Sequence, residues 1–444
     1  MTPSPAAPVA PAVLVSQPAP GWQPAAHLRA PKLLQAALLL MVIANLGRIP
    51  VFSTGARDAP VLANDIFTLV FLTAAGLTMA HARSVKLDRV ALYGLLFAGI
   101  GGCATLVAIS KFGLTGFEVA VSLAYLGRWL FYFAIYIAAI NVMQREDVLP
   151  VWRALETAVL LFAAFGIIQS IFLPDFAQLV YPESRRYVDW DPQGHRLVST
   201  VLDPNFAGGV ILSALMVHLA QMTGGVRVAA WKPLLLFVAL VFTASRGSAL
   251  AFVVGVAVVL AIRGVGKRLL KFGLVSIGLV AALSPWLLTY AREYNKLTLD
   301  ASALGRLLMW ARGLAVFADN PVIGVGMNTW GFVQERYGWI RLGAATYGIE
   351  GGLLFVAVMT GVVGLAAYLL MMGSAALNAR AVWRSMEIPL EHRALAVGAA
   401  AFTGALIVHS MFTNSLFLPY IMEPLFVLWA FSRVIRESSV PTAR

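Results

Sequence analysis

The sequence predicts an all-α, polytopic integral membrane protein with about twelve transmembrane helices and a large, partly helical loop on the outer side of the membrane. Hydrophobic residues make up 60% of the 444 residues and charged residues only 12%, whereas an ordinary soluble domain has roughly 25% charged residues. Long apolar stretches recur along the chain, and loops rich in Lys and Arg alternate with loops poor in them. These three observations indicate a chain that crosses a bilayer many times.

Each apolar stretch is taken as one membrane crossing, because about 20 helical residues span the roughly 30 Å hydrocarbon layer. Twelve stretches are expected to cross, near residues 33–46, 60–79, 90–109, 117–142, 151–173, 206–222, 229–244, 248–262, 269–290, 347–372, 394–411 and 418–434.

The basic residues predict the orientation of these spans. Counted along the chain, 19 of the 33 Lys and Arg residues fall on one set of alternate loops and tails, 13 fall on the other set, and Arg128 lies inside the fourth span. Because the side richer in Lys and Arg faces the cytoplasm, both chain ends are expected there. Two outer loops, residues 174–205 and 291–346, are long and are the expected functional surface.

The expected domain organisation is one membrane domain between two tails. Residues 1–31 are rich in Ala and Pro and have no apolar core, which is typical of a flexible cytoplasmic tail and not of a signal peptide. Residues 32–436 form the membrane domain, and residues 437–444 form a second cytoplasmic tail. In the larger outer loop, residues 304–317 place apolar side chains on one face, which predicts a helix lying at the membrane interface. We find no internal repeat and no pair of broken helices of the transporter kind.

Several classes of protein and of site are excluded. The net charge of +12 is spread over many loops without an aromatic-rich basic patch, so no nucleic-acid partner is expected. The single cysteine, Cys103, offers neither a disulfide nor a cysteine metal site. No His and carboxylate spacing suggests a metal site, Ser245 has no nucleophile-elbow context, and no phosphate-binding loop precedes a soluble helix. We therefore expect no metal, no cofactor and no ATP-driven chemistry.

Two arginines lie at the outer membrane edge, where orientation does not require a positive charge. Arg246 lies in a short link between two spans, and Arg196 lies just before the sixth span. The guanidinium is a planar set of donors that matches phosphate oxygens and keeps its charge, so both arginines suit a diphosphate. For Arg246 the alternative is an arginine that reaches the lipid headgroups. For Arg196 the alternative is a salt bridge to one of Glu183, Asp189 and Asp191 in the same loop.

The sixth span is expected to begin at Pro204 and Asn205, with Asn205 as the helix cap. A helix that starts on the outer side directs the positive end of its dipole outward, which favours an anion there. Asp203 and Asn205 are therefore candidates for contact with a ligand, and plain capping is the alternative for both.

The predicted interfacial helix carries Arg306 and Arg312, which are six residues apart and need not contact the same ligand. At most one of them is expected to point at the site. Trp310 and Trp330 either stack on a sugar or lie at the level of the lipid headgroups, where Trp is enriched.

Arg128 is the most costly charge in the chain, because it lies about ten residues inside a span. It either reaches an active cavity or joins helices together. His409, near the outer end of the eleventh span, and Asn414 raise the same question, with a structural role as the alternative for the histidine.

These residues occur in an order that resembles the bacterial O-antigen ligase and polymerase superfamily. The resemblance covers roughly residues 194–423. It rests on Arg196 with Asp203-Pro204-Asn205, Ser245-Arg246-Gly247, Gly305-Arg306 to Trp310, Asn320-Pro321 to Gly326, Tyr347-Gly348-Ile349-Glu350-Gly351-Gly352-Leu353-Leu354-Phe355, and His409-Ser410-Met411-Phe412.

The resemblance implies a membrane glycosyltransferase at the periplasmic face of the bacterial inner membrane. Its donor would be a polyprenyl diphosphate-linked oligosaccharide, its acceptor a glycan hydroxyl, and a chain-length regulator could be a further partner. Arg196 and Arg246 would neutralise charge on the leaving diphosphate, and His409 is the third catalytic candidate. The expected substrate-binding residues are Arg306, Arg312, Arg128, Asp203, Asn205, Trp310 and Glu335.

The chain departs from the ligase pattern at one position. Ligases of this family carry a His-Asn pair before the span that corresponds to Tyr347, and in that register this chain has Tyr337-Gly338. The departure favours a polymerase of O-antigen or exopolysaccharide repeat units, with Glu335, His195 or His409 as a substitute base. A ligase remains the first alternative. A lipid-linked glycan transporter or flippase, which would move its cargo without covalent change, is the alternative from another class.

Overall fold

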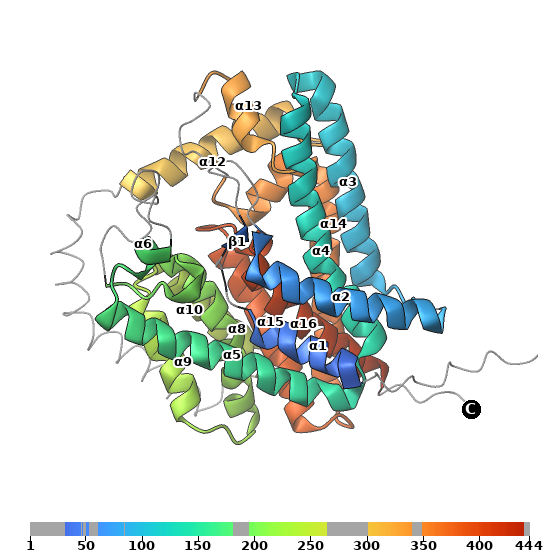
Figure 1. The fold of residues 1–444 in the computed structure, drawn as a ribbon, viewed down its shortest axis with the longest axis vertical. Coiled ribbons are helices and arrows are strands. Elements are labelled where there is room, and N and C mark those ends of the chain that lie inside the picture. The colour runs from blue at the N-terminus through green and yellow to red at the C-terminus, as the bar shows by residue number, and fades with distance from the viewer. Residues whose placement is uncertain are drawn as a thin grey trace, which may run out of the picture.

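The computed structural model describes residues 32–45, 47, 50–52, 61–83, 85–180, 195–263, 301–339 and 349–438. Over these residues the chain forms a helical bundle with one short antiparallel ribbon, β1 (Pro50–Phe52) and β2 (Val61–Leu62) (Figure 1). The helices are α1 (Lys32–Ile43), α2 (Ala63–Ala82), α3 (Arg89–Phe112), α4 (Gly116–Val142), α5 (Arg145–Phe172), α6 (Phe176–Val180), η1 (Ser199–Val201), α8 (Pro204–Gly224), α9 (Trp231–Phe242), α10 (Arg246–Arg263), α12 (Ala301–Asp319), α13 (Trp330–Arg336), α14 (Gly352–Arg384), α15 (Leu390–His409), η2 (Ser415–Phe417) and α16 (Pro419–Glu437).

The predicted all-α, multi-pass membrane fold is confirmed. Within the described ranges, eight helices are long and apolar enough to cross a bilayer: α2, α3, α4, α5, α8, α10, α14 and α15. The shorter apolar helices α1 and α9, together with α16, cover three more of the expected spans. The expected span at 269–290 lies outside the described residues. The helix predicted over residues 304–317 is present as α12.

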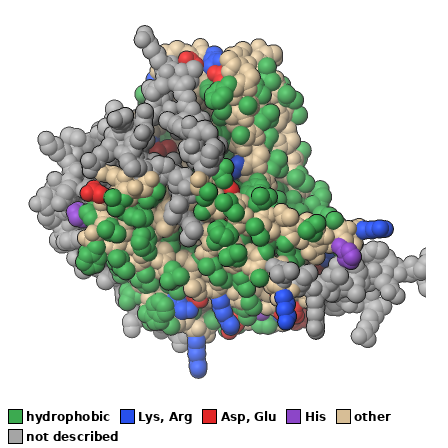
Figure 2. Space-filling model, viewed as in Figure 1, with side chains coloured by type: hydrophobic (Ala, Val, Ile, Leu, Met, Phe, Trp, Pro, Cys, Tyr) green, Lys and Arg blue, Asp and Glu red, His purple; other side chains and the backbone are tan. Residues whose placement is uncertain are grey.

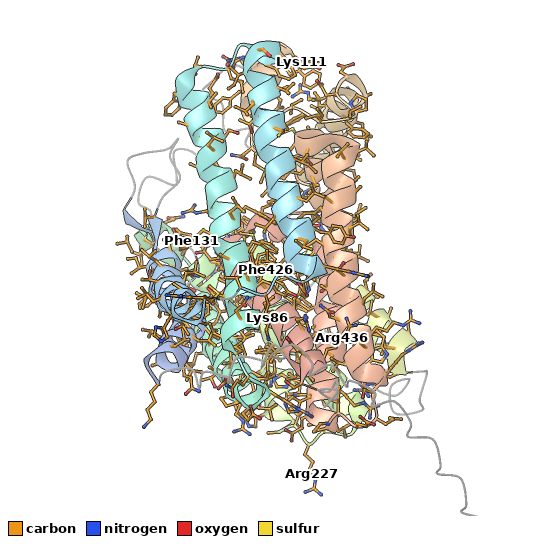
Figure 3. All side chains as sticks on the ribbon, turned by 90° about the vertical axis from the view of Figure 1, so that its right-hand side faces the viewer. Lys86, Lys111, Phe131, Arg227, Phe426 and Arg436 are labelled. Carbon is orange, nitrogen blue, oxygen red and sulfur yellow. The ribbon has the colours of Figure 1, made fainter. Side chains whose placement is uncertain are left out.

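Charged residues gather at the two ends of the bundle. We call the end that carries α13 in Figure 1 the upper end, and the opposite end the lower end. Figure 3 shows Lys111 at the upper end and Arg227 at the lower end. Figure 2 shows several basic side chains projecting from the lower end, below a face dominated by apolar side chains. An apolar belt between charged ends is the pattern expected of a protein embedded in lipid.

Aromatic residues fill the centre of the bundle where α3, α4, α14 and α16 meet. Phe97 packs edge-on against Trp129 and Tyr368, with ring centroids 4.9 and 5.0 Å apart, and Phe133 stacks on Trp129 at 5.0 Å. On the other side of the bundle, α8 packs between α9, α10 and α15 and is the most enclosed of the eight candidate spans. This enclosure matters for the site, because the start of α8 and Arg196 both contact the turn between α9 and α10.

Helix α14 is broken at Gly361, although the sequence predicts an unbroken span there. Gly361 has φ 63° and ψ −169°, and the segment 321–326 inserts at the break. Val362 N donates to Pro321 O (2.7 Å), and Gly326 N donates to Met359 O (2.9 Å). Such bonds replace those that the helix loses, as a broken helix between apolar neighbours requires. The break therefore fastens the link between α12 and α13 to the bundle.

Candidate active site

A buried chain of polar side chains joins three helix ends and is named here the serine–histidine network. Ser245 Oγ donates to Asn205 Oδ1 (2.8 Å), and Ser248 Oγ donates to Ser245 Oγ (2.9 Å). Ser248 Oγ also lies 3.0 Å from His409 Nε2, and His409 Nδ1 contacts Ser415 Oγ. The structure thus brings together the Asp-Pro-Asn, Ser-Arg-Gly and histidine segments, which lie far apart in the sequence.

The start of α8 positions Asn205 for this network. Asp203 has an extended backbone, and its Oδ1 accepts from Asn205 N (2.7 Å) and Phe206 N (3.2 Å), so Asp203 is the cap and Pro204 is the first helical residue. The prediction that Asn205 caps the helix is wrong. The cap lies before the proline because the proline ring already has the helical φ, and the Asn205 side chain is thereby left to accept from Ser245.

Two glycines in α8 allow the network to close. A Cβ on Gly208 would lie 2.0 Å from Ser248 Oγ, and a Cβ on Gly209 would lie 3.2 Å from His409 Cε1. Small residues at helix contacts let backbones approach closely inside a membrane. Sequence reasoning missed Ser248 and Ser415 as network members. The adjacent glycines in α8 were the available signal that another helix approaches there.

Arg196 and Arg246 are fastened to the same turn between α9 and α10. Arg196 is 9% exposed, and its Nε donates to Thr243 O (2.9 Å). The turn continues through Ala244, which has a left-handed backbone (φ 47°), to Arg246, the exposed first residue of α10. Arg246 therefore lies at the positive end of the α10 dipole. The acidic residues expected as alternative partners of Arg196 lie outside the described residues.

A second polar group joins α12 to the start of α14. Arg306 forms an ion pair with Glu350, and the Trp310 indole donates to the Glu350 carbonyl. Gly352 N then donates to Ser410 O (2.7 Å), so this group contacts the turn that follows His409. Glu350 lies in the motif 347–355 but was not among the predicted site residues.

Arg312 and Trp330 lie apart from this second group. The Arg312 guanidinium lies over the Trp339 ring, 5.3 Å from its centroid, and so contacts a different partner from Arg306. Trp330 is 1% exposed and packs against Trp339, with the two ring centroids 6.4 Å apart. The expectation that Trp330 stacks on a sugar or lies among the headgroups is therefore wrong, because the loop around it folds into the bundle.

Glu335 belongs to an ion-pair cluster at the upper end of α4. Arg336 contacts Glu335 Oε2 (3.2 Å) and Glu118 Oε2 (2.7 Å), which ties α13 to the turn between α3 and α4. Nearby, Tyr337 donates its hydroxyl to Asp319 (2.8 Å); burial and this carboxylate raise the pKa of Tyr337. Tyr337 therefore stays neutral at ordinary pH and does not replace the missing histidine as a base.

Of the remaining candidates, Arg128 and His195 have structural partners. Arg128 pairs with Asp65 (2.7 Å), which also accepts from Tyr132 (2.7 Å), so Arg128 joins α4 to α2. His195 is exposed, has a left-handed backbone (φ 58°) and contacts Ser170 O (3.3 Å). Asn414 directly precedes η2.

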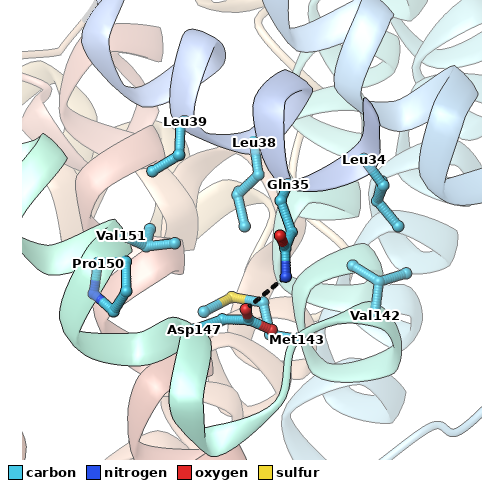
Figure 4. Close-up of a pocket in the computed structure, with 9 residues that line it drawn as sticks. All are labelled: Leu34, Gln35, Leu38, Leu39, Val142, Met143, Asp147, Pro150 and Val151. Atoms are coloured by element: carbon cyan, nitrogen blue, oxygen red, sulfur yellow. Dashed lines mark hydrogen bonds between the residues drawn. The ribbon is translucent and has the colours of Figure 1, made fainter. Parts of the chain in front are cut away.

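A pocket lies at a different place, between α1 and the start of α5 (Figure 4). Apolar side chains dominate its lining, and Gln35 Nε2 donates to Asp147 Oδ1 (3.0 Å) across it. It includes no residue of the serine–histidine network.

The comparison with known families supports the same part of the chain. Residues 234–369 match the family model described as O-Antigen ligase, and this range includes Arg246, Arg306 and Glu350. This match supports a place for the chain in the O-antigen ligase-like superfamily. This superfamily consists of membrane glycosyltransferases of ligase and polymerase type. No curated protein matches this O-antigen ligase-like chain. Arg196 and His409 lie outside the matched range, and their link to it is the geometry described above.

Proposed function

We propose that this O-antigen ligase-like protein polymerises O-antigen or exopolysaccharide repeat units from a polyprenyl diphosphate-linked donor at the periplasmic face of the inner membrane. The observation that carries the proposal is the turn 243–246. Its Thr243 carbonyl accepts a hydrogen bond from the buried Arg196, and its last residue, Arg246, begins α10. Ser245 and Ser248 connect the turn to His409. Two fixed positive charges at a helix N-terminus suit a diphosphate at the membrane surface.

In the proposed reaction an acceptor hydroxyl attacks the anomeric carbon of the donor sugar. The bond from that carbon to the diphosphate oxygen breaks, and its electron pair leaves with the polyprenyl diphosphate. Arg196 and Arg246 stabilise the negative charge that grows on this leaving group. Since diphosphate is already a good leaving group, positioning and charge supply much of the rate.

His409 has a positioning role in this proposal. It is fully buried, and Ser248 and Ser415 contact its two ring nitrogens. It therefore orients the start of α10, and with it Arg246, and does not itself meet a substrate.

The periplasmic assignment rests on the distribution of basic residues. Lys86, Arg227 and Arg436 belong to the loops and tails richer in Lys and Arg, and Figure 3 shows Arg227 at the lower end. The starts of α8 and α10, which carry the site, belong to the opposite side. The positive-inside rule then gives a cytoplasmic lower end and cytoplasmic chain ends.

A ligase is the second candidate, because the matched family model is described as O-Antigen ligase. The Tyr337-Gly338 sequence in place of the His-Asn pair favours the polymerase. The two reactions leave different products in a host from which the gene has been deleted. Loss of long chains with single repeats still displayed indicates a polymerase. Long glycan stranded on the lipid carrier indicates a ligase.

The site assignment is tested by complementing that deletion with Arg246→Ala. Removing one fixed donor to a developing anion typically lowers the rate about 10²–10³-fold, so long-chain glycan should be lost while the protein level stays unchanged. Arg227→Ala is the matched control, because Arg227 is exposed at the lower end and should retain full product. Normal product from Arg246→Ala would contradict the assignment.

A further inference from the structure

The Glu350 carboxylate, two residues before the start of α14, is not yet used by the proposed reaction. Its side chain is 45% exposed, and Arg306 Nε contacts only Oε2. Among the described residues no hydrogen bond is assigned to Oε1. A carboxylate held by one oxygen, with the other open to an incoming hydroxyl, has the geometry of a proton acceptor.

Glu350 is held in place from three directions. Arg306 binds its side chain, Trp310 binds its carbonyl, and Gly352 N donates to Ser410 O. Gly351 has φ 153°, and a Cβ on Gly352 would lie 2.6 Å from Ser410 Oγ. The two glycines therefore allow the chain to enter α14 close to Ser410, directly after Glu350. Functional groups held by their own supporting contacts are typical of preorganised sites.

Glu350 and Arg246 flank one short turn. The turn 410–412 follows His409, and Gly352 contacts its first residue, Ser410. Its last residue, Phe412, lies against α10, since a Cβ on Gly247 would lie 2.9 Å from Phe412 Cβ. Glu350 lies two residues before Gly352, which contacts one end of this turn. Arg246 directly precedes Gly247, which contacts the other end.

The other groups considered as a base are less suitable. Both ring nitrogens of the buried His409 have hydroxyl partners. Glu335 belongs to the cluster with Arg336 and Glu118, and among the described residues no hydrogen bond or ion pair joins it to the turn 410–412. His195 lies beside Ser170 at the end of α5.

We propose that Glu350 is the general base that accepts the proton of the acceptor hydroxyl, an inference that rests on the glycosyl transfer proposed above. The hydroxyl oxygen bonds to the anomeric carbon, and its proton moves to Oε1 of Glu350. The electron pair of the broken carbon–oxygen bond leaves with polyprenyl diphosphate. The protonated carboxyl then returns its proton to water. Arg306 holds Oε2 and so fixes the direction in which Oε1 points.

The test uses the purified full-length protein in liposomes, with polyprenyl diphosphate-linked glycan isolated from the host as donor. Glu350→Gln keeps an oxygen for Arg306 and loses the basic group, so kcat should fall about 10²–10³-fold, while the KM for donor changes less than about twofold. Glu350→Ala should regain part of its kcat when formate is added, because formate supplies the missing carboxylate. Glu437→Gln, in an ion pair with Lys86 at the last residue of α16, is the matched control and should leave kcat unchanged.

The outcomes separate this inference from the proposed function. If the wild type makes no product from this donor, the proposed function is wrong. If the wild type is active and Glu350→Gln is equally active, only the role of Glu350 is wrong. A loss of kcat in Glu350→Ala that formate does not restore means that Glu350 is structural, and this too overturns the inference. Comparable thermal unfolding of all variants shows that each has folded.

Discussion

Because α14 is broken at Gly361, we expect Gly361→Ala to lower the free energy of unfolding. Gly361 combines φ 63° with ψ −169°, a region that is essentially restricted to glycine. A Cβ added there would lie 2.1 Å from Val322 O, so the inserted segment would have to move. That segment accepts from Val362 N through Pro321 O (2.7 Å) and from Val363 N through Val322 O (3.3 Å).

The size of the effect follows from two contributions. A strained backbone of this kind costs about 1–3 kcal/mol. Each of the two hydrogen bonds contributes about 1 kcal/mol to the free energy of unfolding. Gly361→Ala should therefore lower the free energy of unfolding by about 3–5 kcal/mol.

Thermal unfolding in detergent micelles measures this effect, and Gly373→Ala on the same helix is the matched control. A Cβ at Gly373 would meet no atom within 4 Å, so alanine there should be neutral or stabilise α14 by about 0.5–1 kcal/mol. We expect Gly361→Ala to unfold several degrees below the wild type and Gly373→Ala at or above it. Equal midpoints for the two variants would refute the account of the break.

Two further predictions concern buried polar contacts. Arg128→Met leaves Asp65 without its cation and should lower the free energy of unfolding by about 3 kcal/mol. Adding Asp65→Asn should recover most of this loss. A double variant as unstable as the single one would show that the ion pair is not the cause. Ser248→Ala removes the hydroxyl between Ser245 and His409 and should lower the free energy of unfolding by about 1–3 kcal/mol. The control Ser110→Ala on α3 should change it by less than about 0.5 kcal/mol. Both are measured as unfolding midpoints, and a neutral Ser248→Ala would contradict the network.

Hydropathy and charge were sufficient to predict most of the fold. Helices such as α3 and α5 are long apolar stretches, and a bilayer permits little else for such a stretch. The break at Gly361 could not be predicted, because nothing local separates this glycine from others in the same helix. Only the distant segment 321–326 makes the break favourable.

The candidate site was predictable as a set of segments but not as an arrangement. Arg196 and Arg246 were recognisable from their chemistry and their place at the membrane edge. Ser248 and Ser415 are ordinary small residues, and only packing brings them to His409. The proposed role of Glu350 was equally hidden, since it depends on the contact with Arg306, which lies 44 residues earlier in the chain.

The most direct test of the central claim is a transfer assay with the purified protein in liposomes, using polyprenyl diphosphate-linked repeat units as the only glycan. Mass spectrometry would follow both the glycan and the released lipid. The account predicts longer glycan, with one free polyprenyl diphosphate released for each glycosidic bond formed, and loss of both with Arg246→Ala. Donor that crosses the membrane with no bond made or broken would contradict it and identify a transporter.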